Sequence, residues 1–354
     1  MGHDISTLYR KINLFLESLL DTGKNIIGSK NKIYYIVEPI DWTIKREGIA
    51  FKKNIPSIVT RSTTRGLNNK LVHFGSNPIY NPKTSLHNKT IISYYHVTPK
   101  DTQIDNLSQY FKNVDIIHTS CQITKDKLVK LGVPDSKIVV IPIPVDTNNF
   151  YPYTTKRRQQ LKQKFQLPVN KFIIGSFQKD GNGWQEGNEP KLIKGPDILC
   201  DALIKISKII PIHVLLTGPS RGYVKNRLQA ANISYSHFYP KYEEIPNLFN
   251  VLDLYLVTSR EEGGPKMVLE SMACGIPLIS TKVGQAPEII KSGTDAFLVN
   301  QEDTDTIVNI TNNLYYHPDI RQKISQNAVI KSQQYSLKKI SKLYWDKLYY
   351  PLLK

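Results

Sequence analysis

The stretch that most constrains the fold of this chain is residues 257–287, VTSREEGGPKMVLESMACGIPLISTKVGQAP. Just before and at its start, the apolar run 254–257 has the length and composition of a strand. Residues 259–266 are polar and carry a Gly-Gly-Pro core, which is typical of a tight turn. Residues 267–274 have apolar side chains at helical spacing, and a glycine and a proline then end that helix before a second apolar run. The stretch therefore predicts one βαβ unit of a parallel sheet.

The turn that opens this helix has the chemistry of an anion-binding site. The first N–H groups of a helix lack an intrahelical acceptor, and the helix dipole adds positive potential at the same place. In this sequence the groups concerned belong to Gly263, Gly264, Lys266 and Met267. We therefore expect this turn to bind a phosphate.

Two carboxylates bracket the turn. Glu262 lies in the loop, and Glu270 lies in the helix that follows. Side chains of a helix lean toward its N-terminus, so the Glu270 carboxylate can point back to the loop. A carboxylate only accepts hydrogen bonds, which suits the hydroxyl groups of a ribose. A phosphate on the N–H groups and a ribose on Glu270 together predict a nucleotide.

The segment EEGGPKMVLESMACGIPLIS resembles the Glu-x7-Glu signature of family-4 retaining glycosyltransferases with the GT-B fold. The resemblance covers residues 114–300 well and residues 1–100 only in general layout. It implies an α/β protein of two Rossmann-like domains that face each other across a cleft. The activity it implies is transfer of a sugar from a nucleotide diphosphate sugar to a glycan or lipid-linked acceptor, with retention of configuration.

The resemblance assigns the donor site to residues of the second half of the chain. Glu270 would bind the ribose, Glu262 would hold the sugar, and Lys194 would neutralise the diphosphate leaving group. The remaining donor-binding candidates are Gly263, Gly264, Pro265, Lys266, Lys179 and Arg221. No metal or other cofactor is expected, because Lys194 and the helix start would serve the diphosphate.

Two of these candidates leave alternatives open. The resembled family has a basic residue at the end of strand 171–177, where residues 176–178 of this chain are not basic. Either Lys179 substitutes for it, or the diphosphate relies on Lys194 and the backbone. Arg221, in a later glycine-bearing loop, is a candidate anion contact, and a solvated loop arginine is the alternative.

The resemblance and the alternation of strands with polar linkers divide the chain into three parts. These are an acceptor-side domain at 1–150, a nucleotide-sugar-binding domain at 151–335, and a C-terminal helix at 336–354 that returns to the first domain. His96 ends a strand of the first domain, where open α/β sheets bind ligands, and the family often has a histidine beside the donor sugar there. His96 is therefore a catalytic candidate, with a structural role as the alternative. An amphipathic segment at 5–20 is expected to pack on this domain or to contact a membrane or acceptor.

Apolar runs mark the expected strands, and helical periodicity marks the expected helices. The strands are 32–37, 58–59, 71–74, 91–95, 114–120, one that starts the segment 137–150, 171–177, 213–217, 254–257 and a run from 278. The helices are 123–131, 196–206, 267–274, 307–314 and 336–353. Asp303 and Asp305 form a D-x-D pattern, which holds a metal in the other large glycosyltransferase fold. Because they precede a helix, we expect them to cap it instead.

The net charge indicates which classes of partner the protein could bind. A charge of +17 with a pI of about 9.5 favours contact with nucleotide phosphates, an anionic membrane or nucleic acid, unless it reflects compositional bias alone. No apolar run reaches the roughly 18–20 residues of a membrane span, and three scattered cysteines fit a reducing cytoplasm. We expect a cytoplasmic protein with possible peripheral membrane contact. One alternative function is a GT-B protein that binds a nucleotide sugar without transferring the sugar. The other is a nucleic-acid-binding protein, but the sequence has neither the zinc-ligand spacing nor the RNA-binding motifs that would support it.

Overall fold

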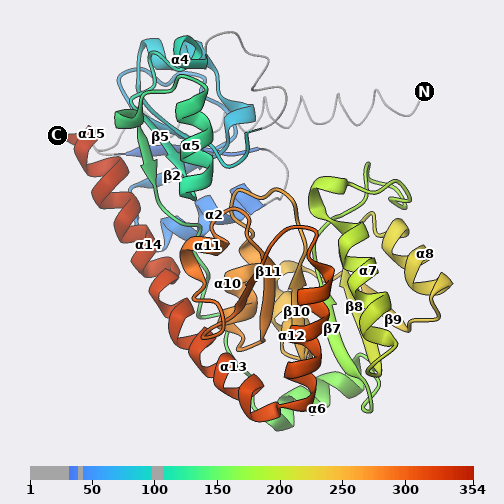
Figure 1. The fold of residues 1–354 in the computed structure, drawn as a ribbon. Coiled ribbons are helices and arrows are strands. Elements are labelled where there is room, and N and C mark those ends of the chain that lie inside the picture. The colour runs from blue at the N-terminus through green and yellow to red at the C-terminus, as the bar shows by residue number, and fades with distance from the viewer. Residues whose placement is uncertain (1–31, 39–42, 98–106) are drawn as a thin grey trace, which may run out of the picture. The chain divides into compact units, whose positions relative to one another are not determined.

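The computed structural model describes residues 32–38, 43–97 and 107–354 (Figure 1). They form two compact units. The first unit runs to Pro142 and includes Leu337–Lys354, and the second unit is Ile143–Ser336. Each unit contains a six-stranded sheet in which all neighbouring strands are parallel. The predicted α/β class with two Rossmann-like domains is therefore confirmed.

The sheet of the first unit has the strand order β2-β1-β3-β4-β5-β6. Its strands are β1 (Ile33–Ile36), β2 (Ile58–Arg61), β3 (Leu71–Phe74), β4 (Lys89–Ser93), β5 (Ile116–Thr119) and β6 (Ile138–Val140). The described helices are α2 (Thr43–Lys52), α4 (Leu107–Tyr110), α5 (Gln122–Lys130), α14 (Leu337–Tyr344), the π-helical turn Trp345–Tyr349 and α15 (Tyr350–Leu353). Every side chain of β1 and β3 is buried, as is typical of parallel strands covered on both faces.

The sheet of the second unit has the strand order β12-β11-β10-β7-β8-β9. Its strands are β7 (Phe172–Ser176), β8 (Ile212–Thr217), β9 (Tyr235–Phe238), β10 (Leu254–Val257), β11 (Leu278–Thr281) and β12 (Phe297–Val299). Its helices are α6 (Thr155–Lys164), α7 (Pro196–Ser207), α8 (Gly222–Ala230), α9 (Ile245–Phe249), α10 (Lys266–Ala273), α11 (Ala286–Ile289), α12 (Thr304–Tyr316) and α13 (Pro318–Ser332).

Alternate side chains of the central strands enter separate cores on the two faces of this sheet. Ile173 and Tyr255 belong to a cluster that includes residues of α9, α10 and α13. Ile174 and Leu254 belong to a second cluster with residues of α7, α8 and α12. Burial on both faces explains why these strands are continuous apolar runs in the sequence.

The order of strands in the second sheet reverses between β7 and β10. From β7 the chain proceeds through β8 to β9, and it then returns to the other side of β7 to form β10. In an open α/β sheet, the carboxyl ends of the strands at such a reversal form the ligand-binding crevice. Here β7 ends at Ser176 and β10 ends at Val257, so the residues that follow these two positions are expected to line a site.

The cap of α12, the three cysteines and the apolarity of the helices were also considered in the sequence. The carboxylate of Asp303 accepts a hydrogen bond from the N–H group of Thr306 at 3.0 Å, so the predicted helix cap is confirmed. All three cysteines are buried and free. None of the helices in the described ranges has the length and apolarity that crossing a membrane requires. The amphipathic segment at 5–20 lies outside the described residues.

A chain of buried hydrogen bonds ties the C-terminal segment into the first unit. The hydroxyl group of Tyr349 lies 2.8 Å from Nδ1 of His73, whose Nε2 lies 2.9 Å from Oγ of Ser93. The same Ser93 oxygen lies 2.8 Å from Nδ1 of His118, and Nε2 of His118 lies 2.9 Å from the carbonyl oxygen of Ile141. Burial lowers the pKa of His118 to about 4 and the pKa of His73 well below its usual value. Both rings are therefore neutral at neutral pH.

We expect the buried imidazole of His118 to make the stability of the protein depend on pH. Between about pH 6.5 and about pH 4 the unfolded chain binds a proton that folded His118 does not, so the free energy of unfolding decreases as the pH falls. From about pH 7.5 to about pH 5, the wild type should lose about 2 kcal/mol more than His118→Asn. Urea unfolding of both proteins across this range measures the difference. Equal losses in the two proteins would contradict the prediction.

Candidate functional site

The candidate site lies at the carboxyl ends of β7 and β10. Lys194 ends a 3-10 turn, Leu192–Lys194, that precedes α7, and Glu262 follows β10. Nζ of Lys194 lies 2.7 Å from Oε2 of Glu262, and the two side chains are 17% and 10% exposed. The residues that the sequence assigned to the diphosphate and to the sugar therefore meet in a largely buried ion pair.

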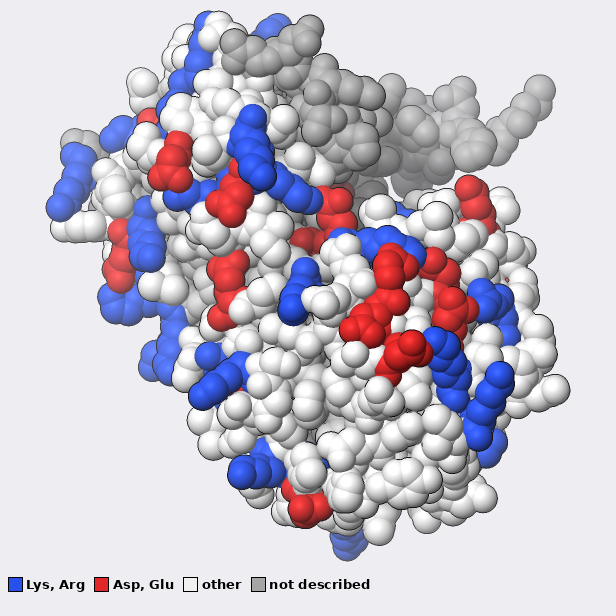
Figure 2. All heavy atoms as spheres, viewed as in Figure 1, with Lys and Arg blue, Asp and Glu red and all other residues white. Residues whose placement is uncertain are grey.

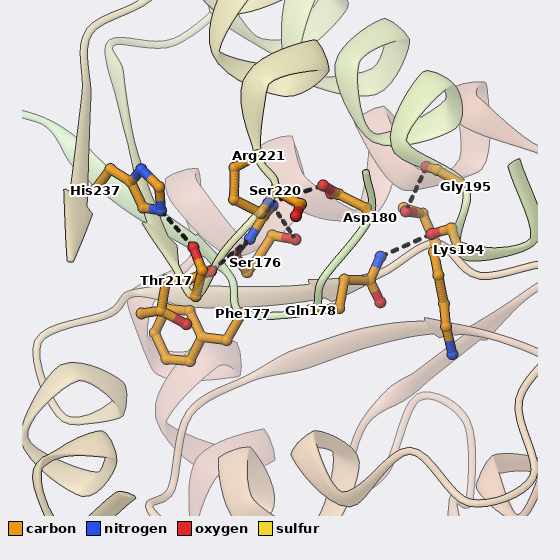
Figure 3. A network of polar contacts seen from close by, with 12 residues as sticks. Ser176, Phe177, Gln178, Asp180, Lys194, Gly195, Thr217, Ser220, Arg221 and His237 are labelled. Carbon is orange, nitrogen blue, oxygen red and sulfur yellow. Dashed lines mark hydrogen bonds and ion pairs between the residues drawn. The ribbon is translucent and has the colours of Figure 1, made fainter. Parts of the chain in front are cut away.

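Two polar side chains that the sequence analysis did not select hold this ion pair. Oγ of Ser259 lies 2.8 Å from Oε1 of Glu262 and 3.2 Å from Oε1 of Gln178. Gln178 donates through Nε2 to the carbonyl oxygen of Lys194 at 2.7 Å (Figure 3). The network thus joins the end of β7, the start of α7 and the end of β10. The signal for both residues was their position, where side chains reach the crevice. Gln178 directly follows the predicted strand 171–177, and Ser259 comes two residues after the predicted strand 254–257.

Two glycines fix the backbone around the ion pair. Gly195 has φ of +62°, and a Cβ atom there would lie 2.0 Å from the carbonyl oxygen of Thr258. The Thr258 hydroxyl also donates to the Gly195 carbonyl at 2.9 Å. Gly284 has φ of +51°, and a Cβ atom there would lie 2.6 Å from the carbonyl oxygen of Gly263. Both loops pack so closely that a side chain at either glycine would displace them.

Helix α10 begins at the glycine turn, as predicted. Pro265 is its N-cap residue and Lys266 its first residue, and no side chain caps it. Its first N–H groups therefore point out of the helix toward the turn that contains Gly263 and Gly264. Glu270, 5% exposed, accepts a hydrogen bond from the hydroxyl group of Tyr242 at 3.0 Å.

Arg221 is an interior residue. It is 1% exposed, and its Nε lies 2.9 Å from Oδ1 of Asp180. Its Nη1 donates to the carbonyl oxygens of Ser176 and Thr217 at 2.6 and 3.1 Å (Figure 3). The alternative of a solvated loop arginine is therefore wrong, and no observation tests Arg221 as an anion contact. The guanidinium group serves Asp180 and the strand ends; burial raises the pKa of Asp180, and the charge of Arg221 opposes that effect.

Lys179 and His96 are the two remaining candidates. Nζ of Lys179 lies 3.8 Å from the centroid of the Trp184 ring, a cation–π contact at the start of the polar loop after β7. His96 is exposed and follows β4 in the first unit. Its place beside a donor sugar stays a prediction.

The described part of the chain contains no group of three or more His, Cys, Asp or Glu side chains that could hold a metal ion. In the D-x-D pattern, Asp303 caps α12, and Oδ1 of Asp305 lies 2.6 Å from Nζ of Lys205. Acidic and basic side chains are interspersed over the face of the molecule that Figure 2 shows, rather than segregated into one basic surface.

Residues 190–330 match the family model described as glycosyl transferases group 1. Among curated proteins, the chain is 23% identical to N-acetyl-alpha-D-glucosaminyl L-malate synthase of Bacillus anthracis, over 77% of this chain and 68% of that protein. It is also 23% identical to D-inositol 3-phosphate glycosyltransferase of Corynebacterium jeikeium, over 66% of this chain and 55% of that protein.

Solved structures show the same fold. A glycosyltransferase from Rickettsia africae has a TM-score of 0.74 at 17% identity and covers 92% of this chain and 100% of its own. HepE of Anabaena in complex with UDP has a TM-score of 0.71 at 18% identity and covers 90% and 99%. The GT-B fold is therefore confirmed. Together with the family match and the names of the relatives, these comparisons support a hexosyltransferase-type enzyme.

The burial of Arg221 predicts a structural role that can be measured. Arg221→Met leaves the buried Asp180 carboxylate unpaired, so the free energy of unfolding should fall by about 3–5 kcal/mol. The control is Arg227→Met, which removes a surface ion pair with Asp201 and should cost about 1 kcal/mol or less. Denaturant unfolding compares the two. An Arg221→Met protein that is as stable as the wild type but binds nucleotide poorly would assign Arg221 to the ligand.

Proposed function

We propose that this chain is a retaining glycosyltransferase that takes its sugar from a nucleoside diphosphate sugar. The observation that carries the proposal is the Lys194–Glu262 ion pair at the strand reversal, beside the uncapped start of α10. This crevice offers a cation and outward-pointing N–H groups, which suit a diphosphate. It also offers a carboxylate, which suits hydroxyl groups of the same ligand. The family match over residues 190–330 covers most of these elements.

The donor is proposed to be a uridine diphosphate sugar. HepE of Anabaena has been solved with UDP and with UDP-glucose, and its fold is the fold of this chain. Glu270 binds the ribose hydroxyls, and the pair Glu262 and Glu270 then forms the Glu-x7-Glu signature. Calorimetry with UDP, ADP, GDP and dTDP tests the choice of base.

The proposed chemistry needs no covalent nucleophile from the protein. The bond between the anomeric carbon and the diphosphate breaks, the acceptor oxygen bonds to the same carbon from the same face, and the acceptor proton passes to the leaving phosphate. Lys194 carries three donors, so it can stay with Glu262 and still donate to a phosphate oxygen. This stabilises the charge that develops on the leaving group. The anomeric coupling in the proton NMR spectrum of the product tests retention.

The acceptor is proposed to be a glycan or a lipid-linked glycan, with His96 beside the donor sugar. The net charge of +17 supports a peripheral contact with an anionic membrane on the cytoplasmic side. Flotation with anionic vesicles at low salt is the measurement for that contact.

One observation favours a second candidate function. The end of β7 has no basic residue at 176–178, which suits a GT-B protein that binds a nucleotide sugar without transferring the sugar. Calorimetry and a transfer assay on the same preparation separate the two functions, because such a protein would bind the donor but release no nucleoside diphosphate.

The two glutamates should have different kinetic effects. The ribose does not change during the reaction, so Glu270→Ala should raise the donor KM about ten- to a hundredfold. Glu262 lies at the sugar, so Glu262→Ala should lower kcat by a similar factor and weaken binding of the free nucleoside diphosphate less. Glu243→Ala, which changes an exposed glutamate, is the control. If Glu270→Ala binds the nucleoside diphosphate as tightly as the wild type, the ribose assignment is wrong.

Transfer should not depend on a metal. Lys194 and the start of α10 are proposed to supply the positive charge at the diphosphate, so activity should be unchanged in excess EDTA. Initial rates with and without EDTA measure this. Loss of activity in EDTA followed by recovery with manganese would refute the proposal.

A further inference from the structure

The loop between β7 and α7 brings two further lysines toward the site. Its two arms run antiparallel, with a bridge between Gly181 and Pro190. Directly beside this bridge, the N–H group of Lys191 donates to the carbonyl oxygen of Asp180 at 2.7 Å. Lys179 and Lys191 therefore lie on the two opposite arms at the base of the loop, next to the turn that ends at Lys194.

The loop is held in one conformation by contacts with the start of α8. The hydroxyl group of Ser220 lies 3.0 Å from the Gly183 carbonyl oxygen, and the N–H group of Gly222 donates to the Glu186 carbonyl oxygen at 2.6 Å. A Cβ atom at Gly187, where φ is +71°, would lie 2.5 Å from the Ser220 backbone. Such close packing fixes the arms of the loop and with them the positions of the two lysines.

Four charged groups share this neighbourhood. The Lys191 side chain is partly buried, and its pKa is lowered by burial and by the charges of Lys194 and Lys179, whereas the charge of Glu262 raises it. Three ammonium groups and one carboxylate leave an excess of two positive charges. An excess of positive charge among partly buried groups favours the binding of an anion.

A diphosphate requires more positive charge than Lys194 alone supplies. Lys194 is already paired with Glu262, and each phosphoryl group of a sugar nucleotide carries a negative charge. The end of β7 provides no basic side chain, and the guanidinium group of Arg221 is committed to Asp180. Besides the start of α10 with Lys266, the two loop lysines are further positive groups beside Lys194.

Of these two, Lys191 is the stronger candidate. It lies in the same short turn as Lys194, whose N–H group donates to the Lys191 carbonyl oxygen at 2.8 Å. The ammonium group of Lys179 instead lies on the Trp184 ring at 3.8 Å, which already offsets part of its charge.

We propose that Lys191 binds the diphosphate of the donor and takes the place of the basic residue missing from the end of β7. The proposal rests on the proposed function, since it assigns a residue to that same donor site. Lys179 contributes at longer range and more weakly.

The experiment compares ligands with and without the diphosphate. Lys191→Met keeps an unbranched side chain of similar length and removes its charge. Calorimetry should show UDP binding weakened about ten- to a hundredfold, uridine binding unchanged, and a smaller dependence of UDP affinity on salt. Lys179→Met should weaken UDP binding less. The control is Lys208→Met, an exposed lysine at the far end of α7, which should bind both ligands as the wild type does.

The outcomes distinguish this inference from the proposed function. If Lys191→Met binds UDP like the wild type while Lys194→Met does not, the inference is overturned and the proposed function stands. Equal weakening of UDP and uridine by Lys191→Met would also overturn it, because the effect would then come from a distorted loop. If the wild type binds none of UDP, ADP, GDP and dTDP, the proposed function fails and the inference fails with it.

Discussion

The reversal of strand order between β7 and β10 is the constraint on which the chemistry of the second unit depends. It leaves the carboxyl ends of two adjacent strands without a crossover connection above them, so the segments that leave these strands can approach each other. Gln178 leaves β7, and Ser259 and Glu262 leave β10. Their hydrogen bonds link the segments that follow the two strands, and Glu262 pairs with the Lys194 side chain.

Burial decides which charges of this unit are available to a ligand. Asp180 and Arg221 are both fully buried, and the arginine also donates to strand carbonyls, so this pair supports the fold. Lys194 and Glu262 form an equally close pair but keep part of their surface exposed. A pair that retains solvent contact can exchange partners when a ligand arrives, whereas a fully buried pair cannot do so without leaving a charge unpaired.

The sequence predicted those features that depend on neighbouring residues. Strands buried on both faces appear in the sequence as apolar runs, and the glycines before α10 predict the turn there. Strand β9 was missed because its side chains are all only partly buried, so YSHF has no apolar signature. Helix α13 was missed because its buried positions, Ile324, Ala328 and Ser332, form only a narrow stripe. The burial of Arg221 could not be seen in its loop, because Asp180 lies far away in the chain.

The buried hydrogen bond between His73 and Tyr349 has a consequence for folding during synthesis on the ribosome. The second unit is one continuous segment, so its core can close as soon as residue 336 has emerged. The first unit is made earlier but contains Leu337–Lys354, and its last hydrogen bonds join residues 276 positions apart. Its nascent strands must therefore wait, with the pocket for Tyr349 unfilled, until residues 337–354 have been synthesised. Of the two units, the one whose synthesis begins first is therefore the one that is completed last.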